Sequence, residues 1–308
     1  VPVGILGLAL ATLFIPDLRE QHRPPFDILG FVLSGAGLAL FMTGSTTLGL
    51  NILPRPLVLT FFFGGAAMLV GYVFHALRVP DPIIDLKLFR IPTFTVSMIG
   101  SFLFRIGVGA TPFLLPLLLQ VGFGMSPFHS GLITFASAIG AIAMKFVAPP
   151  LLRRHGFRSI LVINSVVAGF FVSLPGTFGP ATPVALMTGL LLIGGFFRSL
   201  QFTSVNALAF ADVPQARMSR ATTLTSVAQQ LSLSLGISIG AMTLEASTRL
   251  SGGVITADTF WPAFVVVGVL SALSGLVFAR LPDHAGSEMS GHRREPAPDP
   301  VTAMRERG

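Results

Sequence analysis

Arg105 stands out because it lies inside the apolar run FLFRIGVGATPFLLPLLLQ, residues 102–120. At roughly 100° per residue, Arg105, Gly109, Pro112 and Pro116 share one face of a helix. A charge at the centre of a bilayer costs at least ~2.5 kcal/mol, so it usually faces a bundle interior or an aqueous cavity. Prolines free backbone carbonyl groups, which is tolerable where those groups meet water or a ligand. We therefore expect this face to line a cavity. The alternative is a structural cation, hydrogen-bonded to neighbouring carbonyls or to a carboxylate.

Two further apolar stretches contain polar side chains. In GGFFRSLQFTSVNALAF, Arg198 and Gln201 are three residues apart and Asn206 lies further around the helix. In ATTLTSVAQQLSLSLGISIG, Ser226 and Gln229 belong to a polar stripe with three- and four-residue spacing. Such a stripe should face a cavity or another helix. Interhelical hydrogen bonding is the preferred explanation for the serines and threonines, whereas the arginines and amides are expected at the cavity. The candidate cavity residues are Arg105, Gly109, Pro112, Pro116, Arg198, Gln201, Asn206, Ser226 and Gln229.

Composition identifies the solvent around these stretches. Hydrophobic residues make up 52% of the 308 residues and charged residues only 11%, whereas an ordinary soluble domain has roughly 25% charged residues. A polytopic helical membrane protein explains this, because backbone groups in lipid must be satisfied within each spanning helix. The formal charge of +7 would suggest nucleic-acid binding in a soluble protein, but here the basic residues lie between apolar runs. The lack of cysteine excludes disulfides and thiolate metal sites.

The apolar runs predict an all-α fold with about nine transmembrane helices. The expected spans are 1–16, 27–49, 56–77, 94–121, 128–149, 159–178, 183–210, 220–245 and 259–280. The last eight have the ~20 residues that a spanning helix needs, and the first is short. No basic segment precedes the first run, so a signal peptide is not expected.

Lys and Arg in the connections predict the orientation. Connections rich in these residues alternate with connections that have one or none. Because basic connections are typically cytoplasmic, the amino terminus is expected outside and the carboxy terminus inside. This orientation also predicts an odd number of further spans upstream, or a truncated reading frame.

Several segments resemble one transporter family. VPVGILGLALATLFIPDLREQHRPPFDILGFVLSGAGLAL is similar to the junction of the sixth and seventh helices of the fourteen-span drug:proton antiporters of the major facilitator superfamily. PDPIIDLKLFRIPTF resembles a later connection, and FRIGVGATPFLLPLLLQVGFGMSPFHSGL the helix and external turn that follow. FFRSLQFTSVNALAFADVPQARMSRATTLTSVAQQLSLSLGISIG matches a bacterial subgroup.

The resemblance implies a partial major facilitator fold. Residues 1–16 would be the last helix of an otherwise missing amino-terminal bundle, and 27–79 two linking helices. Residues 94–282 would form the complete carboxy-terminal six-helix bundle, built from inverted three-helix repeats, and 283–308 a disordered cytoplasmic tail. The implied function is proton-coupled efflux of drugs or other amphipathic molecules across a bacterial inner membrane.

The stretch APPLLRRHGFRSIL resembles the second copy of the superfamily's helix-connecting motif. Arg153, Arg154, Gly156 and Arg158 are its candidate motif residues. The acidic residue of the family motif is missing, so a latch through an aspartate in this loop is not expected. The arginines could instead clamp a helix terminus or an anionic lipid.

The acidic residues limit the mechanism. All thirteen lie in connections, at helix ends or in the tail. Proton coupling normally needs a titratable group that is desolvated and then exposed, so the coupling carboxylate is expected on helices outside this chain. No nucleotide-binding or zinc-protease motif occurs, so we expect no enzyme, cofactor or metal.

The expected partners are a small-molecule substrate, protons, the lipid bilayer and a missing or separately encoded amino-terminal half, but no nucleic acid. Two alternatives stay open: a transport-inactive remnant or interaction partner, and an exporter of a lipid or metabolite. The two intramembrane arginines favour anionic or amphipathic cargo over cations.

Overall fold

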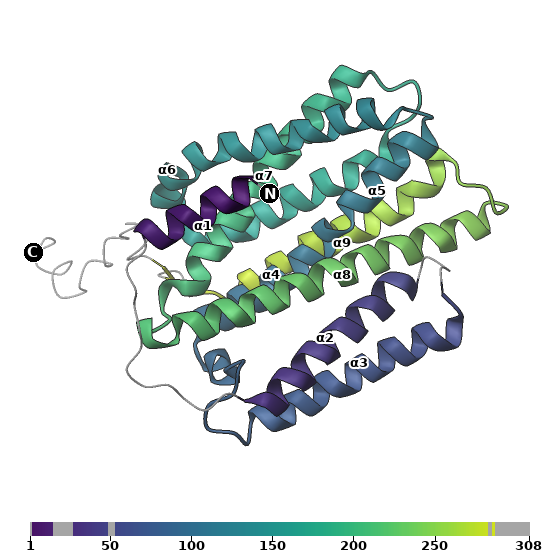
Figure 1. Ribbon diagram of the computed structural model, residues 1–308. Coiled ribbons are helices and arrows are strands. Elements are labelled where there is room, and N and C mark those ends of the chain that lie inside the picture. The colour runs from purple at the N-terminus through teal and green to yellow at the C-terminus, as the bar shows by residue number, and fades with distance from the viewer. Residues whose placement is uncertain (1, 15–26, 49–52, 283–284, 287–308) are drawn as a thin grey trace, which may run out of the picture.

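The computed structural model describes residues 2–14, 27–48, 53–282 and 285–286, and all regular structure in these ranges is helical (Figure 1). The long elements are α1 (Pro2–Phe14), α2 (Ile28–Leu48), α3 (Arg55–Ala76), α4 (Pro92–Gly109), α5 (Thr111–Leu117), α6 (Pro127–Ser173), α7 (Val184–Ala211), α8 (Met218–Leu250) and α9 (Trp261–Phe278). Short helical turns cover Leu86–Arg90, Leu118–Gly122, Leu174–Thr177, Gln215–Arg217 and Ala257–Phe260. The predicted all-α class is confirmed.

Seven helical stretches in the described part of the chain are long and apolar enough to cross a membrane. α4, α5 and the π-helical turn after them form one stretch, Pro92–Gly122, where a single span was predicted. α6 contains two predicted spans, separated by a kink at Gly156. The first predicted span differs, because α1 has only 13 residues and is too short to count as a spanning helix.

The two halves of α6 run antiparallel. Ser137 in the first half and Val172 in the second line the same hollow, although they lie far apart in the sequence. This requires a reversal, and Gly156 supplies it with φ 72° and ψ 165°. That backbone region is essentially restricted to glycine.

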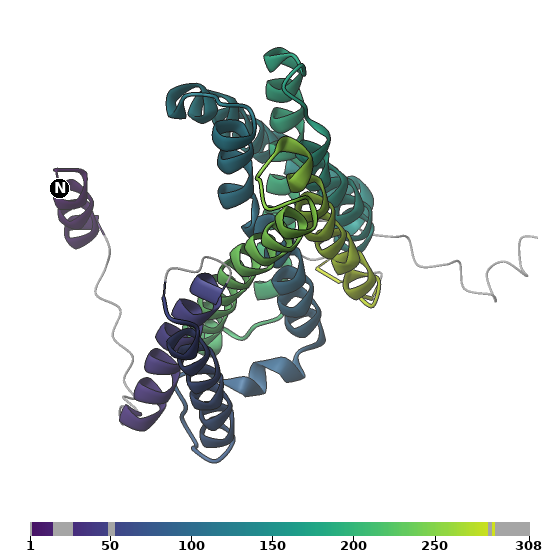
Figure 2. The same ribbon diagram turned by 90° about the vertical axis from the view of Figure 1, so that its right-hand side faces the viewer.

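The helices from α4 onward form one bundle. α4 contacts α7, α8 and α9, and α6 packs against α7 and α9. α2 and α3 form a separate antiparallel pair that lies along α8, as Figures 1 and 2 show. Ser238 Oγ on α8 donates a hydrogen bond to the Ser45 carbonyl oxygen on α2 at 2.6 Å. An interhelical hydrogen bond of this kind is how polar side chains hold helices together in lipid.

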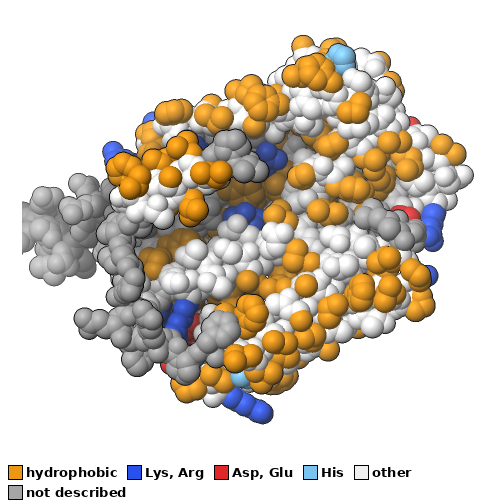
Figure 3. All heavy atoms as spheres, viewed as in Figure 1, with side chains coloured by type: hydrophobic (Ala, Val, Ile, Leu, Met, Phe, Trp, Pro, Cys, Tyr) orange, Lys and Arg blue, Asp and Glu red, His pale blue; other side chains and the backbone are white. Residues whose placement is uncertain are grey.

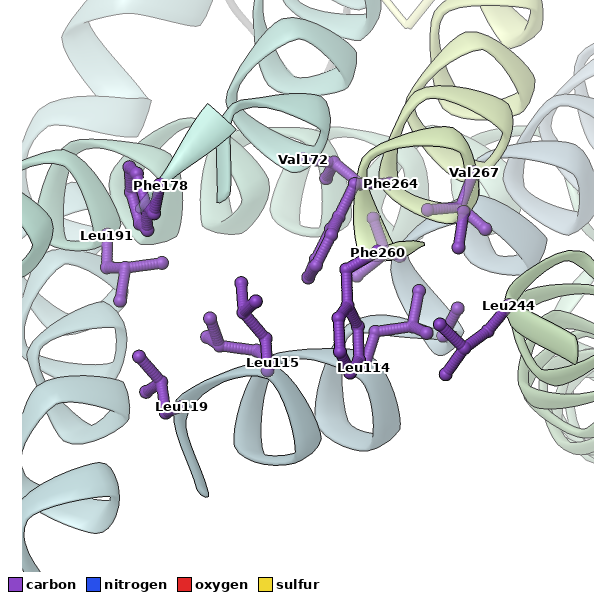
Figure 4. Close-up of a cluster of buried hydrophobic side chains, with 14 of the residues drawn as sticks. Leu114, Leu115, Leu119, Val172, Phe178, Leu191, Leu244, Phe260, Phe264 and Val267 are labelled. Carbon is purple, nitrogen blue, oxygen red and sulfur yellow. The ribbon is translucent and has the colours of Figure 1, made fainter. Parts of the chain in front are cut away.

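The core of the bundle is a cluster of aliphatic and phenylalanine side chains from α4 to α9 and the short helical turns between them (Figure 4). Leu114, Leu119, Phe260 and Phe264 are completely buried in it. The exterior is also apolar, as the orange side chains of Figure 3 show. Phe146 is 80% exposed and Leu276 69% exposed, which suits helices whose outer faces contact lipid.

The ends of the helices that carry the basic connections meet at one end of the molecule. Thr93 Oγ1 donates to Asp212 Oδ2 at 2.6 Å, and Arg220 pairs with Asp81 at 3.0 Å. Asp27 pairs with His75 Nε2 at 2.8 Å. The first contact joins α4 to the end of α7, the second joins the connection after α3 to α8, and the third joins α2 to α3.

The predicted disordered tail lies almost entirely outside the described residues. Ala285 and Gly286 are the exceptions, and Ala285 is buried with Phe157 and Leu208 in a cluster at the basic end of the bundle. The first residues after α9 therefore pack on the bundle.

Candidate functional site

A hollow between α4, α7 and α8 brings together Arg105, Asn206 and Gln229. The small polar side chains Ser97, Ser101 and Thr225 line it as well, with apolar walls from Met98, Phe102, Val205, Ala209 and Ala228. The free space inside is about 10 Å³, which is room for about one water molecule. Figure 3 shows basic side chains in a recess of this face, between α7 and α8.

The guanidinium group of Arg105 is held from three sides. Its Nε donates to Ser101 Oγ at 3.0 Å, and its Nη2 donates to Asn206 Oδ1 at 3.3 Å. Its Cζ lies 4.4 Å from the centroid of the Phe202 ring, a cation–π geometry that stabilises the charge by about 2 kcal/mol when desolvated. The residue is only 8% exposed.

The described residues provide no carboxylate within ion-pair distance of Arg105. A desolvated cation without a counter-ion favours the binding of an anion beside it. Asn206 is exposed and Gln229 half-buried, so an anionic group can reach the mouth of the hollow. Both amides can donate to it.

Arg198 lies in a second hollow and not beside Arg105. This hollow is between α5, α6 and α7 and has a volume of about 30 Å³. Nη2 of Arg198 donates to Ser137 Oγ at 3.3 Å. The structure therefore separates the two intramembrane arginines that the sequence predicts for one cavity.

Gln201 is completely buried and does not line the Arg105 hollow. Its Oε1 accepts from Asn164 Nδ2 at 2.7 Å, and its Nε2 donates to the Leu161 carbonyl oxygen at 3.2 Å. Asn164 Nδ2 also donates to the Phe197 carbonyl oxygen at 2.9 Å. This network joins the second half of α6 to α7, which is a packing role.

The other four candidates also lie away from the Arg105 hollow. Gly109 packs on α8, where a Cβ at this position would lie 3.0 Å from the Leu233 Cα. Pro112 and Ser226 are exposed, and Pro116 is half-buried within α5. The predicted face of four residues is interrupted because α4 ends at Gly109 and α5 begins at Thr111.

The four candidate motif residues lie at the reversal of α6. Gly156 is buried and forms the turn, Arg153 and Arg154 are exposed, and Arg158 is half-buried. The positive φ of Gly156 explains why this position of the motif is a glycine. The arginines surround this turn at the basic end of the bundle.

The described carboxylates lie at helix ends or in connections. Asp85 is buried beside Arg220, 4.0 Å away. Burial alone would raise the pKa of the Asp27 carboxyl, but hydrogen bonds from the Gly30 amide and from His75 together hold that pKa below its ordinary value. In the described ranges no three His, Asp or Glu side chains gather as a metal site would require.

Sequence reasoning missed Ser97, Ser101 and Phe202, whereas Thr225 belongs to the polar stripe that contains Gln229. The first two precede Arg105 at intervals of four residues, so the same helical-face argument that selected Gly109 could have found them. Phe202 gave no signal, because an aromatic residue in an apolar helix looks like core.

Residues 97–306 match the model of the family described as Major Facilitator Superfamily. The chain belongs to the major facilitator superfamily. The resemblance seen in the sequence is thus confirmed, and the chain is a multi-pass membrane protein of a transporter family, not an enzyme.

Its relatives in this superfamily include proteins of three Salmonella strains, S. paratyphi A, S. typhi and S. typhimurium LT2. Each carries the name "Putative multidrug resistance protein MdtD" and is 33% identical over 302 residues. The match covers 96% of this chain but 63% of each relative. The chain therefore spans less than two thirds of the length of these superfamily members.

Proposed function

We propose that this chain forms the cargo-binding part of a secondary transporter that exports amphipathic small molecules bearing an anionic group. The observation that carries this proposal is the hollow of Arg105, Asn206 and Gln229. It offers one cation and two amides without a carboxylate among the described residues. Membership of the superfamily and the multidrug-resistance name of its relatives support export of small molecules.

The cargo must bind at the opening of the hollow, or the helices around the hollow must move apart. The free space of about 10 Å³ does not admit a drug-sized molecule. An anionic group could rest on Arg105 while the apolar part of the cargo lies along Phe102 and Phe202 at α4 and α7. Separation of α7 from α8 would admit more of the molecule, and rigid-body rocking of helices during alternating access is one way to produce it.

The proposed location is a bacterial inner membrane, with the amino terminus outside and the carboxy terminus in the cytoplasm. The support is the distribution of Lys and Arg, because the basic connections belong on the cytoplasmic side. The contacts between Asp81 and Arg220 and between Thr93 and Asp212 bring two of these connections together.

Proton coupling is proposed for the complete transporter, with its titratable carboxylate on helices outside this chain. The reason is that the described carboxylates lie at helix ends or in connections. The 308-residue chain in proteoliposomes should therefore give no drug-dependent proton flux. Robust coupled flux from this chain alone would overturn the proposal about the carboxylate.

Equilibrium dye binding tests the cargo proposal on the purified chain in nanodiscs. A fluorescent aryl sulfonate and a cationic dye of similar size are titrated against the wild type, Arg105→Gln and Arg249→Gln. A charged hydrogen bond contributes ~1.5–3 kcal/mol, so Arg105→Gln should raise the Kd of the sulfonate about tenfold or more. Arg249, which is largely exposed and pairs with Glu245, is the matched control.

Tighter binding of the cationic dye, unaffected by Arg105→Gln, would contradict the proposal. Equal weakening of the sulfonate by both substitutions would point to overall charge and not to the hollow. Either result would remove the basis for anionic cargo.

A further inference from the structure

The hollow around Arg198 has features that the proposed transport function does not use. Arg198 is the fifteenth of the 28 residues of α7, so it lies near the middle of a spanning helix. The guanidinium group has five N–H donors, and the described residues give it one hydrogen bond, to Ser137 Oγ. They offer it no carboxylate within ion-pair distance. A cation at this depth needs a compensating charge or water.

A second polar group in the same hollow also lacks a partner. Thr111 Oγ1, at the start of α5, is buried and makes no hydrogen bond within the described chain. A buried hydroxyl without a partner costs about 1–3 kcal/mol. Its O–H can donate to an acceptor in the hollow. The Ser137 hydroxyl donates to the Thr134 carbonyl oxygen at 3.0 Å, and rotation about its C–O bond would turn this O–H into the hollow.

The other residues that line this hollow are apolar, and they limit the size of a ligand that can bind in it. Phe171, Val172, Leu115, Leu191 and Pro175 form the walls. The free volume of about 30 Å³ exceeds the minimum for one water molecule and suits a single small ion. Gly195 lets α7 approach α6 closely here, because a Cβ at this position would collide with the Ser137 carbonyl oxygen.

We propose that Arg198, Ser137 and Thr111 form a binding site for a small monovalent anion of the halide class between α5, α6 and α7. The guanidinium neutralises the charge of the anion, and the unpartnered Thr111 hydroxyl donates a hydrogen bond to it. The Ser137 hydroxyl exchanges its hydrogen bond to the Thr134 carbonyl oxygen for one to the anion. The bound anion compensates Arg198 in the apolar interior and joins α5 to α6 and α7. This proposal is independent of the cargo site, because the two hollows share none of their lining residues.

Chloride is the probe for this site. The thermal unfolding of the full chain in nanodiscs of neutral lipid is followed while chloride replaces gluconate at constant ionic strength. A ligand that binds only the folded state raises the melting temperature in a saturable manner. We expect such a saturable rise for the wild type and no chloride-dependent rise for Arg198→Gln.

Two milder substitutions keep the test decisive if Arg198→Gln does not fold. Thr111→Val and Ser137→Ala each remove one proposed donor, and each should raise the chloride concentration at half-saturation about five- to tenfold. The matched control Arg249→Gln should retain the wild-type response. Crystals soaked in bromide should show an anomalous peak beside Arg198.

Identical melting curves in chloride and gluconate would overturn the proposal. So would a wild-type chloride response in both Thr111→Val and Ser137→Ala. A bromide peak beside Arg105 instead of Arg198 would place the anion in the cargo hollow and would equally contradict this assignment.

Discussion

At the scale of single residues, the surroundings of Arg105 indicate a binding site and not a structural contact. Ser101, Asn206 and Phe202 hold its guanidinium group, but no described carboxylate neutralises it. A cation whose charge stabilised the fold would be expected in an ion pair, because breaking a buried pair costs 3–5 kcal/mol. The cost of desolvating an unpaired charge offsets the contribution of these contacts, so Arg105 adds little net stability and its charge is available to a ligand.

Arg105→Leu should separate stability from binding. Since the substitution removes a desolvated charge, the melting temperature of the chain should stay the same or rise. Binding of an anionic aryl sulfonate should be lost. Thermal unfolding and fluorescence titration of the same preparation measure the two effects, and a loss of stability of about 3 kcal/mol or more would identify Arg105 as a structural cation.

Gln201→Leu should have the opposite pattern. The substitution removes one of the two acceptors of the buried Asn164 amide and the donor to the Leu161 carbonyl oxygen, so the free energy of unfolding should fall by about 1–3 kcal/mol. Sulfonate binding should not change, because Gln201 lies outside the Arg105 hollow. Denaturant unfolding in detergent measures the free energy of unfolding. Unchanged stability together with weaker binding would place Gln201 in the cargo site.

The sequence predicted part of the site at this scale. An arginine and amides in apolar helices pointed to Arg105, Asn206 and Gln229, which the structure brings together. It could not separate Gln201 and Arg198 from them. Which side of α7 faces which neighbour depends on the rotation of the helix in the bundle, and helical spacing within one segment does not contain that information.

At the scale of elements, the reversal of α6 depends on a single residue. The sequence predicted two spans here, because Pro149, Pro150 and the arginines interrupt the apolar run. Helical hydrogen bonding nevertheless continues past both prolines to the kink. The exact position of the reversal at Gly156 came only from the structure, although the motif resemblance already included this glycine.

Gly156→Ala should destabilise the chain by about 1–3 kcal/mol, because φ 72° with ψ 165° is a conformation that alanine avoids. Gly131→Ala is the matched control in the same helix, where a Cβ would meet open space. This control should be neutral or slightly stabilising, since alanine favours a helix over glycine. Thermal unfolding compares the two variants, and equal effects would contradict the role of Gly156.

The hydrogen bond between Asp27 and His75 should make the contact between α2 and α3 sensitive to acid. The folded pKa of Asp27 is below its ordinary value of 3.8. Its contribution to stability is therefore fully present above that value and is lost as the pH falls through the lower, folded pKa.

Asp27→Asn should lower stability by about 1 kcal/mol at neutral pH, and the difference from wild type should disappear in strong acid. Unfolding curves recorded from neutral pH to strong acid measure this difference in stability. Asp258→Asn, at an exposed carboxylate, is the control and should show a smaller difference. A wild-type advantage that persists unchanged in strong acid would exclude the charge of Asp27 as its source.

At the scale of the whole molecule, hydropathy predicted the membrane spans well but not their assembly. The predicted spans from residue 27 onward reappear in α2 to α9, while α1 is shorter than a spanning helix. The packing of α2 against α8 was not predicted, because it depends on side-chain contacts such as Ser238 with Ser45. The inverted repeats of the bundle and its division from the linking helices stay predictions.

The absence of cysteine from the sequence allows a direct test of the environment of the Arg105 hollow. Single cysteines replace Asn206 and Gln229 at the hollow and Phe135 and Ile163 on the apolar exterior, where these two side chains are 61% and 64% exposed. Membrane vesicles of both orientations are treated with a charged, membrane-impermeant thiol reagent. We predict that the cysteines at 206 and 229 react rapidly in at least one orientation and that those at 135 and 163 do not. Reaction at 135 and 163 with protection at 206 and 229 would show that lipid surrounds the hollow, and would contradict its assignment as a solvated binding site.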